Sequence, residues 1–155
     1  MSTQTIRIEH PLARGAEVTE QDVWDFPEGL IGLPKHRRFV LLPLPGCAPF
    51  RLLASLDDPT FGLVVVAPGE FAPDYEVSFG PRDLLPLSER DPDHLEVLVP
   101  VVLPGGAAPL ALNLRGPLLL SRSERRGIQR VSANDDHPVR WVPDAAEAGE
   151  PECSS

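Results

Sequence analysis

Prolines and glycines interrupt this chain so often that no long helix fits between them. The 155 residues include 19 prolines and 12 glycines. A proline inside a helix removes a backbone donor and clashes with the preceding turn, whereas short strands accept proline at their ends and edges. The length suffices for one domain with a buried core. We therefore predict an all-β, single-domain, small β-barrel-like fold of about nine or ten short strands.

The clearest pair of strands lies near the centre of the chain. Two apolar runs, residues 50–56 and 61–66, flank the turn-forming residues 57–60, which are Asp-Asp-Pro-Thr. Because Asp accepts local backbone hydrogen bonds and Pro fixes its own φ, this spacing predicts a β-hairpin with two buried arms. Apolar and polar residues then alternate over 75–79, which predicts a third, half-buried strand.

The rest of the pattern predicts further strands and two short helices. Strands are expected at residues 6–8, 39–42, 95–103, 110–114 and 118–120, the third of them interrupted at Pro100. Thr19 and Asp22 have the spacing to cap a single helical turn, and a proline begins a short helix expected over 81–85. The apolar run 26–34 contains two glycines, which predict a bulge or a close backbone approach within a strand.

The net charge of −9 is unevenly distributed. Residues 57–96 hold ten carboxylates against two arginines, a balance of −8. An acidic face repels nucleic acid and favours basic protein partners, while the simpler interpretation is a solubilising surface. Residues 144–155 add four acids and no base, so we expect a domain over 1–143 followed by an acidic, disordered tail.

Three of these carboxylates offer the only candidate chemistry. Asp57, Asp58 and Asp74 could act as acid–base groups in a small β-barrel enzyme, provided that one of them is desolvated and another ionised. Neighbouring strand residues point to opposite faces, so we favour turn formation and surface display for this pair. With Glu76 and Asn113, the three form our candidate partner-binding residues, and we expect no catalytic residue.

Asn113 lies between two leucines in the run Leu-Asn-Leu-Arg-Gly-Pro. On the expected strand it shares a face with Ala111, opposite Leu110, Leu112 and Leu114. An outward amide can bond a neighbouring loop backbone or contact a partner. We favour the scaffold role because a glycine–proline break follows closely.

Other site classes have little support in the sequence. The four histidines are dispersed without ligand spacing, so no metal site or cofactor is expected. The arginine-rich turn 122–130 lacks interleaved aromatic residues, so direct binding of nucleic acid is not expected either. Cys47 and Cys153 do not form a disulfide framework, and no apolar leader or 18-residue apolar run is present. These features predict a cytoplasmic protein without a membrane span.

Several segments, taken together and in order, resemble the flagellar assembly factor FliW family. They are FPEGLIGLPKHRRFVLL, PFRLLASLDDPTFGLVVVAP, FAPDYEV, LALNLRGPLLL, and GIQRV followed by Asp135, Asp136 and Arg140. The resemblance covers about residues 4–141, which is nearly the whole expected domain.

The resemblance implies a small cytoplasmic protein without catalytic activity. Members of this family bind flagellin, acting somewhat like a chaperone, and bind the dimeric RNA-binding regulator CsrA. Binding of CsrA antagonises its repression of flagellin translation, so secretion of flagellin would free the factor for CsrA in a partner-switching loop. We expect the free protein to be monomeric.

Overall fold

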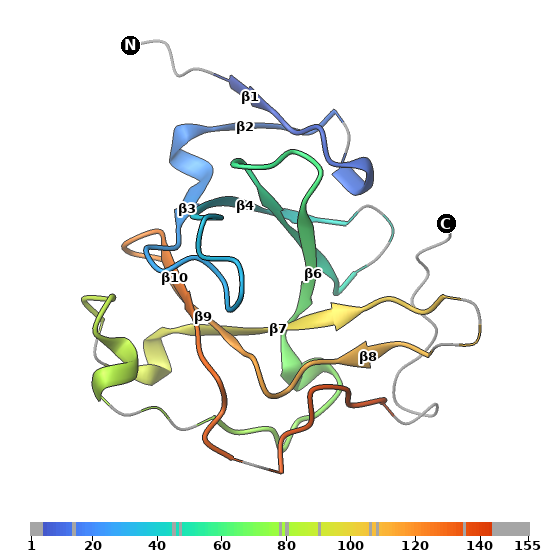
Figure 1. Cartoon of the computed structure of the whole chain (residues 1–155), viewed down its shortest axis with the longest axis vertical. Coiled ribbons are helices and arrows are strands. Elements are labelled where there is room, and N and C mark those ends of the chain that lie inside the picture. The colour runs from blue at the N-terminus through green and yellow to red at the C-terminus, as the bar shows by residue number, and fades with distance from the viewer. Residues whose placement is uncertain are drawn as a thin grey trace.

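A computed structural model describes residues 5–13, 15–44, 46, 48–77, 79, 81–89, 91–105, 107, 109–134 and 136–143. Within this part of the chain, ten strands and five short 3-10 helices occur, and no α-helix (Figure 1). The strands are β1 (Thr5–Arg7), β2 (Glu17–Thr19), β3 (Val23–Asp25), β4 (Arg38–Pro43), β5 (Arg51–Ser55), β6 (Gly62–Val66), β7 (Glu96–Val102), β8 (Ala111–Leu112), β9 (Leu118–Ser121) and β10 (Arg126–Gln129). The helices are η1 (Pro11–Ala13), η2 (Glu20–Asp22), η3 (Pro68–Glu70), η4 (Pro81–Leu84) and η5 (Pro92–His94). The expected all-β class is confirmed.

Seven of the strands form a closed barrel. Their hydrogen-bonded order is β6-β5-β4-β3-β10-β9-β7, and β7 pairs back with β6. Every neighbouring pair is antiparallel except β3 and β10, which meet in parallel at the single register pair Asp25 and Arg126. The remaining strands form a separate β1–β2 hairpin and a short extension, β8, on β7.

The expected central hairpin is present as β5 and β6. Leu52 pairs with Val64 and Leu53 with Leu63. Its turn is closed by main-chain bonds, in which the Phe61 N–H donates to the Asp58 carbonyl over 3.1 Å. All of β5 after its first residue is buried, and so are the last three residues of β6. The prediction of a hairpin with largely buried arms is therefore confirmed.

Strand β7 is continuous through Pro100, where an interruption was expected. Residues 96–98 pair with β9, Pro100 lies opposite Val65 of β6, and residues 101–102 pair with β8. Pro100 thus sits where β7 changes neighbours, and its carbonyl accepts a bond from the Asn113 N–H over 2.8 Å. A proline is tolerated at this change of neighbours because the ladder hydrogen bond that its missing N–H would donate is not required there.

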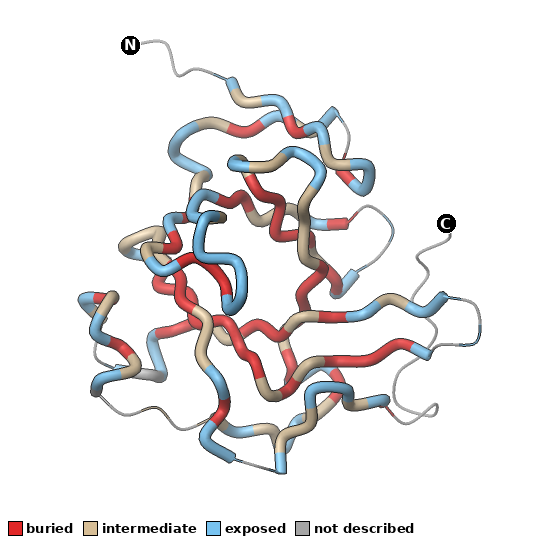
Figure 2. The backbone as a smooth tube through the Cα atoms, in the orientation of Figure 1, coloured by how far each residue is buried: buried red, intermediate tan, exposed pale blue. Residues whose placement is uncertain are grey.

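Buried residues follow the barrel strands (Figure 2), and their apolar side chains form three clusters. One draws residues from six of the seven barrel strands, as only the interior of a closed barrel can: Trp24, Phe39, Leu53, Val65, Leu98, Leu118 and Leu120. A second lies on the outer face of β4 to β7 and is covered in part by the β1–β2 hairpin through Ile8 and Val18. A third, smaller cluster forms outside β7, β9 and β10 around Leu119 and Ile128.

Two segments that were expected to be strands are irregular. In the strand expected over 75–79, the described residues 75–77 and 79 form no strand. Turns precede them, in which the Ala72 N–H donates to the Pro68 carbonyl and the Tyr75 N–H to the Ala72 carbonyl. The run 26–34 is a loop, in which Leu30 and Leu33 form an isolated bridge. Gly29 has φ +68°, and a Cβ there would lie 2.6 Å from the Leu33 carbonyl oxygen. The close backbone approach was thus predicted correctly, but the strand was not.

The expected short helices are present, whereas the strand expected over 110–114 is shorter. Asp22 Oδ2 accepts a bond from the Thr19 N–H over 2.8 Å at the start of η2, and η4 begins at Pro81. Only Ala111 and Leu112 form a strand. Ala111 is buried rather than outward, and β8 is paired with β7 on one side and bridged to Trp141 on the other.

The described residues include no helix long and apolar enough to cross a membrane. The predicted tail, 144–155, lies outside the described part of the chain.

Candidate functional site

Asp57 binds backbone groups rather than a cation. Its Oδ2 accepts bonds from the Arg37 N–H over 2.7 Å and the Arg38 N–H over 3.0 Å. The carboxylate therefore joins the β5–β6 turn to the start of β4 at Arg38, nineteen residues earlier in the chain. Although its side chain is exposed, Asp57 has a structural role that the sequence did not reveal.

Asp58 closes the same turn locally. Its Oδ1 accepts bonds from the Thr60 hydroxyl over 2.7 Å and the Thr60 N–H over 2.9 Å. These bonds hold the pKa of Asp58 below its usual value, because they stabilise the ionised carboxylate. A general acid needs the opposite shift, since it must keep its proton near neutral pH.

A buried serine connects this turn to the loop before β4. Ser55 Oγ accepts bonds from the N–H groups of Asp57 and Asp58, each over 3.1 Å. Its hydroxyl oxygen lies 3.0 Å from His36 Nδ1. With both backbone donors on the oxygen, the Ser55 hydroxyl hydrogen is available to the imidazole nitrogen. Ser55 therefore acts as a connector at this end of the barrel.

Asp74 and Glu76 are exposed on the irregular segment after η3. Tyr75, between them, turns inward. Its hydroxyl donates to the Leu114 carbonyl over 2.6 Å, and its ring centroid lies 4.6 Å from that of His137. Burial raises the pKa of Tyr75 to about 12. Tyr75 thus fixes the segment while its two acidic neighbours face solvent.

Asn113 makes the scaffold contacts expected of it. Its Oδ1 accepts bonds from the Arg115 and Gly116 N–H groups, each over 3.0 Å. These bonds shape the turn between β8 and β9, and the Gln129 amide reinforces it by donating to the Gly116 carbonyl over 2.8 Å. Contact between Asn113 and a partner stays a prediction.

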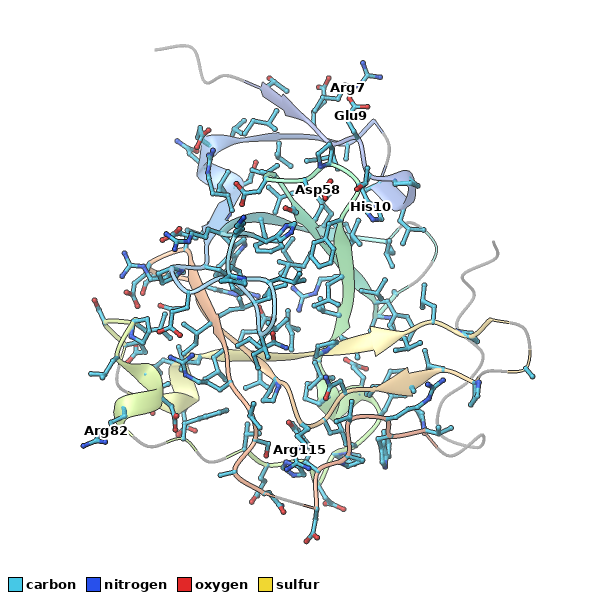
Figure 3. All side chains as sticks on the ribbon, in the orientation of Figure 1. Arg7, Glu9, His10, Asp58, Arg82 and Arg115 are labelled. Carbon is cyan, nitrogen blue, oxygen red and sulfur yellow. The ribbon has the colours of Figure 1, made fainter. Side chains whose placement is uncertain are left out.

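The five candidate residues do not form one surface. Figure 3 shows Asp58 and His10 at the end of the molecule that carries β1 and β2, and Arg115 at the opposite end. Asp74, Glu76 and Asn113 belong to that second end, since Tyr75 bonds Leu114. The three aspartates of the enzyme alternative are therefore not brought together.

The arginine-rich turn 122–130 binds the protein's own chain. Arg125 donates to the Gln21 carbonyl and lies 4.8 Å above the Trp24 ring. Arg126 donates to the Pro86 carbonyl over 3.1 Å. Arg130 donates to the Asp83 carbonyl over 2.9 Å and pairs with Glu28 at 2.8 Å. These contacts use the cations that an RNA-binding patch would present to phosphates.

Glu124, within this turn, has a role that sequence reasoning missed. Its carboxylate accepts bonds from the Ser88 N–H over 2.8 Å and the Glu89 N–H over 3.2 Å. Burial alone would raise the pKa of Glu124, but bonds from Ser88, Ser121 and Glu89 outweigh burial and lower it. No local motif identifies this contact, because its partners lie more than thirty residues away.

A groove with an acidic rim lies beside Glu76. It has a volume of about 350 Å³, and its walls come from the segment after η3, from η5 and from β7 and β9. The lining residues are Glu76, Val77, Phe79, Asp93, Leu95, Val97 and Leu119. Sequence analysis selected Glu76 but not Asp93, and only the fold brings the two to one groove.

Comparison with known proteins gives one consistent result. A family model described as "FliW protein" matches residues 8–142. A flagellar assembly factor FliW from Nitratidesulfovibrio vulgaris (strain DP4) is 39% identical over 125 residues, covering 80% of this chain and 72% of the relative. One of the same name from Clostridium botulinum (strain Alaska E43 / Type E3) is 30% identical over 126 residues, covering 81% and 89%.

The fold also matches a solved structure. The crystal structure of the flagellar assembly factor FliW superimposes with a TM-score of 0.80 and 24% sequence identity. The match covers 91% of this chain and 99% of that chain. The barrel, with its additional strands, is therefore a known architecture.

Proposed function

This chain belongs to the FliW family of flagellar assembly factors, and on that premise we propose that it acts by binding two protein partners. The partners are flagellin and the RNA-binding translational regulator CsrA. In this proposal, the free chain binds CsrA and antagonises its repression of flagellin synthesis, and flagellin competes for the chain.

The observation that carries the proposal is the extent of the family match. It spans residues 8–142, from the end of β1 to the chain that pairs with β8. The match therefore includes the barrel together with the two ends that carry the exposed carboxylates. Acidic surfaces of this kind favour basic protein partners and disfavour nucleic acid.

We infer that the chain is not an enzyme. The alternative with acid–base carboxylates required Asp57, Asp58 and Asp74 to converge, with one of them desolvated. Asp57 and Asp74 are exposed and Asp58 has a lowered pKa. Asp74 lies at the other end of the barrel, since its neighbour Tyr75 bonds Leu114. The geometry thus offers no support for that mechanism.

The proposal extends to the state and location of the chain. We infer a domain over residues 1–143, an acidic tail over 144–155, and a monomer in the cytoplasm when no partner is bound. The proposed binding of flagellin and of CsrA requires neither a cofactor nor direct contact with nucleic acid.

A co-purification experiment tests the proposal. The tagged full chain is expressed in a flagellated bacterial host, and the retained proteins are identified by mass spectrometry. We expect flagellin and CsrA to be retained. With purified proteins, the chain should release a flagellin leader RNA from CsrA in a gel-shift assay, and added flagellin should reverse the release. Retention of neither partner would contradict the proposal.

A further inference from the structure

The outward apolar cluster on β7, β9 and β10 is covered by an excursion of the chain. Val97, Leu119 and Ile128 point away from the barrel interior and pack with Leu84, Leu87 and Leu95. The described residues of this excursion, 79, 81–89 and 91–95, include η4 and η5 and precede β7 (Figure 1).

Several bonds hold this excursion on the barrel. Glu124 binds the N–H groups of Ser88 and Glu89, while Arg126 and Arg130 bind the carbonyls of Pro86 and Asp83. The neighbouring segment is fixed independently by the Tyr75 bond to Leu114. These bonds fix parts of both segments that border the groove, and on the η5 side Leu95 is buried in the outer cluster. A preformed groove binds at a lower entropic cost than one that must be ordered.

The groove has an apolar floor that the excursion does not fully cover. Val77, Phe79 and Val97 are only partly buried where they line it. Its volume of about 350 Å³ is at the lower end of the roughly 300–1,000 Å³ typical of ligand pockets. This space suits one or two apolar side chains from an extended segment better than a large ligand.

The rim of the groove carries an unneutralised negative charge. Among the described residues, Glu76 and Asp93 form no ion pair with a cation. Other acidic side chains do form such pairs, including Glu20 with Arg38, Glu28 with Arg130 and Glu96 with Arg51. Carboxylates beside an apolar floor attract a lysine or arginine that flanks an apolar residue.

We propose that this groove, defined by Glu76, Val77, Phe79, Asp93, Leu95, Val97 and Leu119, binds a protein segment in which apolar side chains are flanked by lysine or arginine. The inference rests on the proposed function, in that the chain acts through protein partners, and it assigns one contact surface and the chemistry of its occupant. The apolar residue fills the groove, and the flanking cations meet Glu76 and Asp93.

The probe is a synthetic peptide, acetyl-KKLVKK-amide, added to the ¹⁵N-labelled full chain and followed by NMR. We expect amide shifts to change at residues 76–79, 93–97 and 119, and the binding to weaken with added salt. Residues 57–60, at the opposite end, should not respond. Two matched peptides, acetyl-KKSSKK-amide and acetyl-EELVEE-amide, should bind at least several-fold more weakly.

Charge reversal on the rim provides the matched variants. Glu76→Lys combined with Asp93→Lys should weaken the peptide about tenfold, the scale of two exposed ion pairs replaced by repulsion. The control is Asp74→Lys, which changes an exposed carboxylate two residues from Glu76 that does not line the groove. It should alter affinity by less than about twofold, since more distant exposed charges are screened. Val97→Thr keeps the side-chain shape, and should weaken the peptide without changing the salt dependence.

Several results would overturn the assignment. These are shifts confined to other residues, equal binding of the serine peptide, or an equal loss in Asp74→Lys. A concentration-dependent dimer by sedimentation, with the same amides affected, would show that a second copy of this chain occupies the groove instead.

Retention of flagellin and CsrA by the same variants separates the two proposals. If the wild-type chain retains its partners but the peptide does not bind at the groove, the groove assignment is wrong and the proposed function stands. If neither partner is retained, the proposed function is wrong. The amide shifts caused by the peptide then show on their own whether the groove binds such a segment.

Discussion

Single polar side chains fix the loops of this protein by accepting bonds from two backbone N–H groups at once. Asn113 does so within its own turn, Asp57 reaches back to the start of β4, and Glu124 reaches the loop after η4. The first role was predictable because all its partners lie within three residues. The other two were not, since nothing local in the sequence indicates a partner nineteen or more residues away.

Asn113→Ala should destabilise the fold. The substitution leaves the N–H groups of Arg115 and Gly116 without their side-chain acceptor, which costs about 1–3 kcal/mol when such groups are shielded from water. Urea unfolding measures the loss. Asn113→Asp keeps an oxygen acceptor and should retain most of the stability. Normal stability of Asn113→Ala with lost partner affinity would instead assign Asn113 to a binding surface.

His10 should make the stability depend on pH. Burial lowers the pKa of His10 from its usual 6.5, and its Nδ1 accepts a bond from the Leu12 N–H over 3.1 Å. The folded state therefore favours the neutral ring. This contribution is complete above pH 6.5 and is lost as the pH falls through the lower folded-state pKa. The free energy of unfolding should decrease less between pH 7.5 and 5.5 in His10→Gln than in the wild type, and equal decreases would contradict the assignment.

At the scale of elements, periodicity predicted strands well where their partners are also strands. It failed at residues 75–79, because alternating apolar side chains also occur in an irregular segment that packs them into different places. Tyr75 reaches Leu114, whereas Val77 and Phe79 line the groove. The turn 122–130 shows a similar ambiguity. Its arginine content is typical of a binding patch, but Arg125, Arg126 and Arg130 bond other parts of the same chain.

Arg130→Ala should therefore cost more stability than Arg122→Ala. Arg130 is 19% exposed and bonds Asp83 and Glu28, whereas Arg122 is 73% exposed and pairs with Glu96 at 3.4 Å. Loss of these partly buried bonds should cost about 1–3 kcal/mol, while the exposed pair should matter by less than about 0.5 kcal/mol. Urea unfolding of both variants provides the comparison. Equal, small effects would show that the Arg130 bonds to Asp83 and Glu28 are not needed to keep the excursion packed on the barrel.

At the scale of the whole molecule, the sequence indicated the strand content and the single domain. It also indicated a barrel-like fold, but not which strands close the barrel, because the β6–β7 contact and the parallel β3–β10 contact each join residues far apart in the chain. Pairing of this kind depends on the complete set of packed faces and not on any local pattern.

Removal of residues 144–155 should leave the melting temperature nearly unchanged. This segment offers almost no apolar side chains to bury. Thermal unfolding of a chain that ends at Pro143 tests the expectation against the full-length protein. A loss of several degrees would show that the segment packs on the domain.

The parallel contact between β3 and β10 has a kinetic consequence. Only one register pair, Asp25 with Arg126, joins these strands, whereas β4 and β5 share five. Transient opening of the barrel should therefore begin at this seam, since the fewest bonds must break there. In native-state hydrogen exchange, the Asp25 amide, which donates to the Arg125 carbonyl, should exchange sooner than the amides of β5. The barrel would then open transiently between β3 and β10 while the pairing of β4 with β5 stays intact.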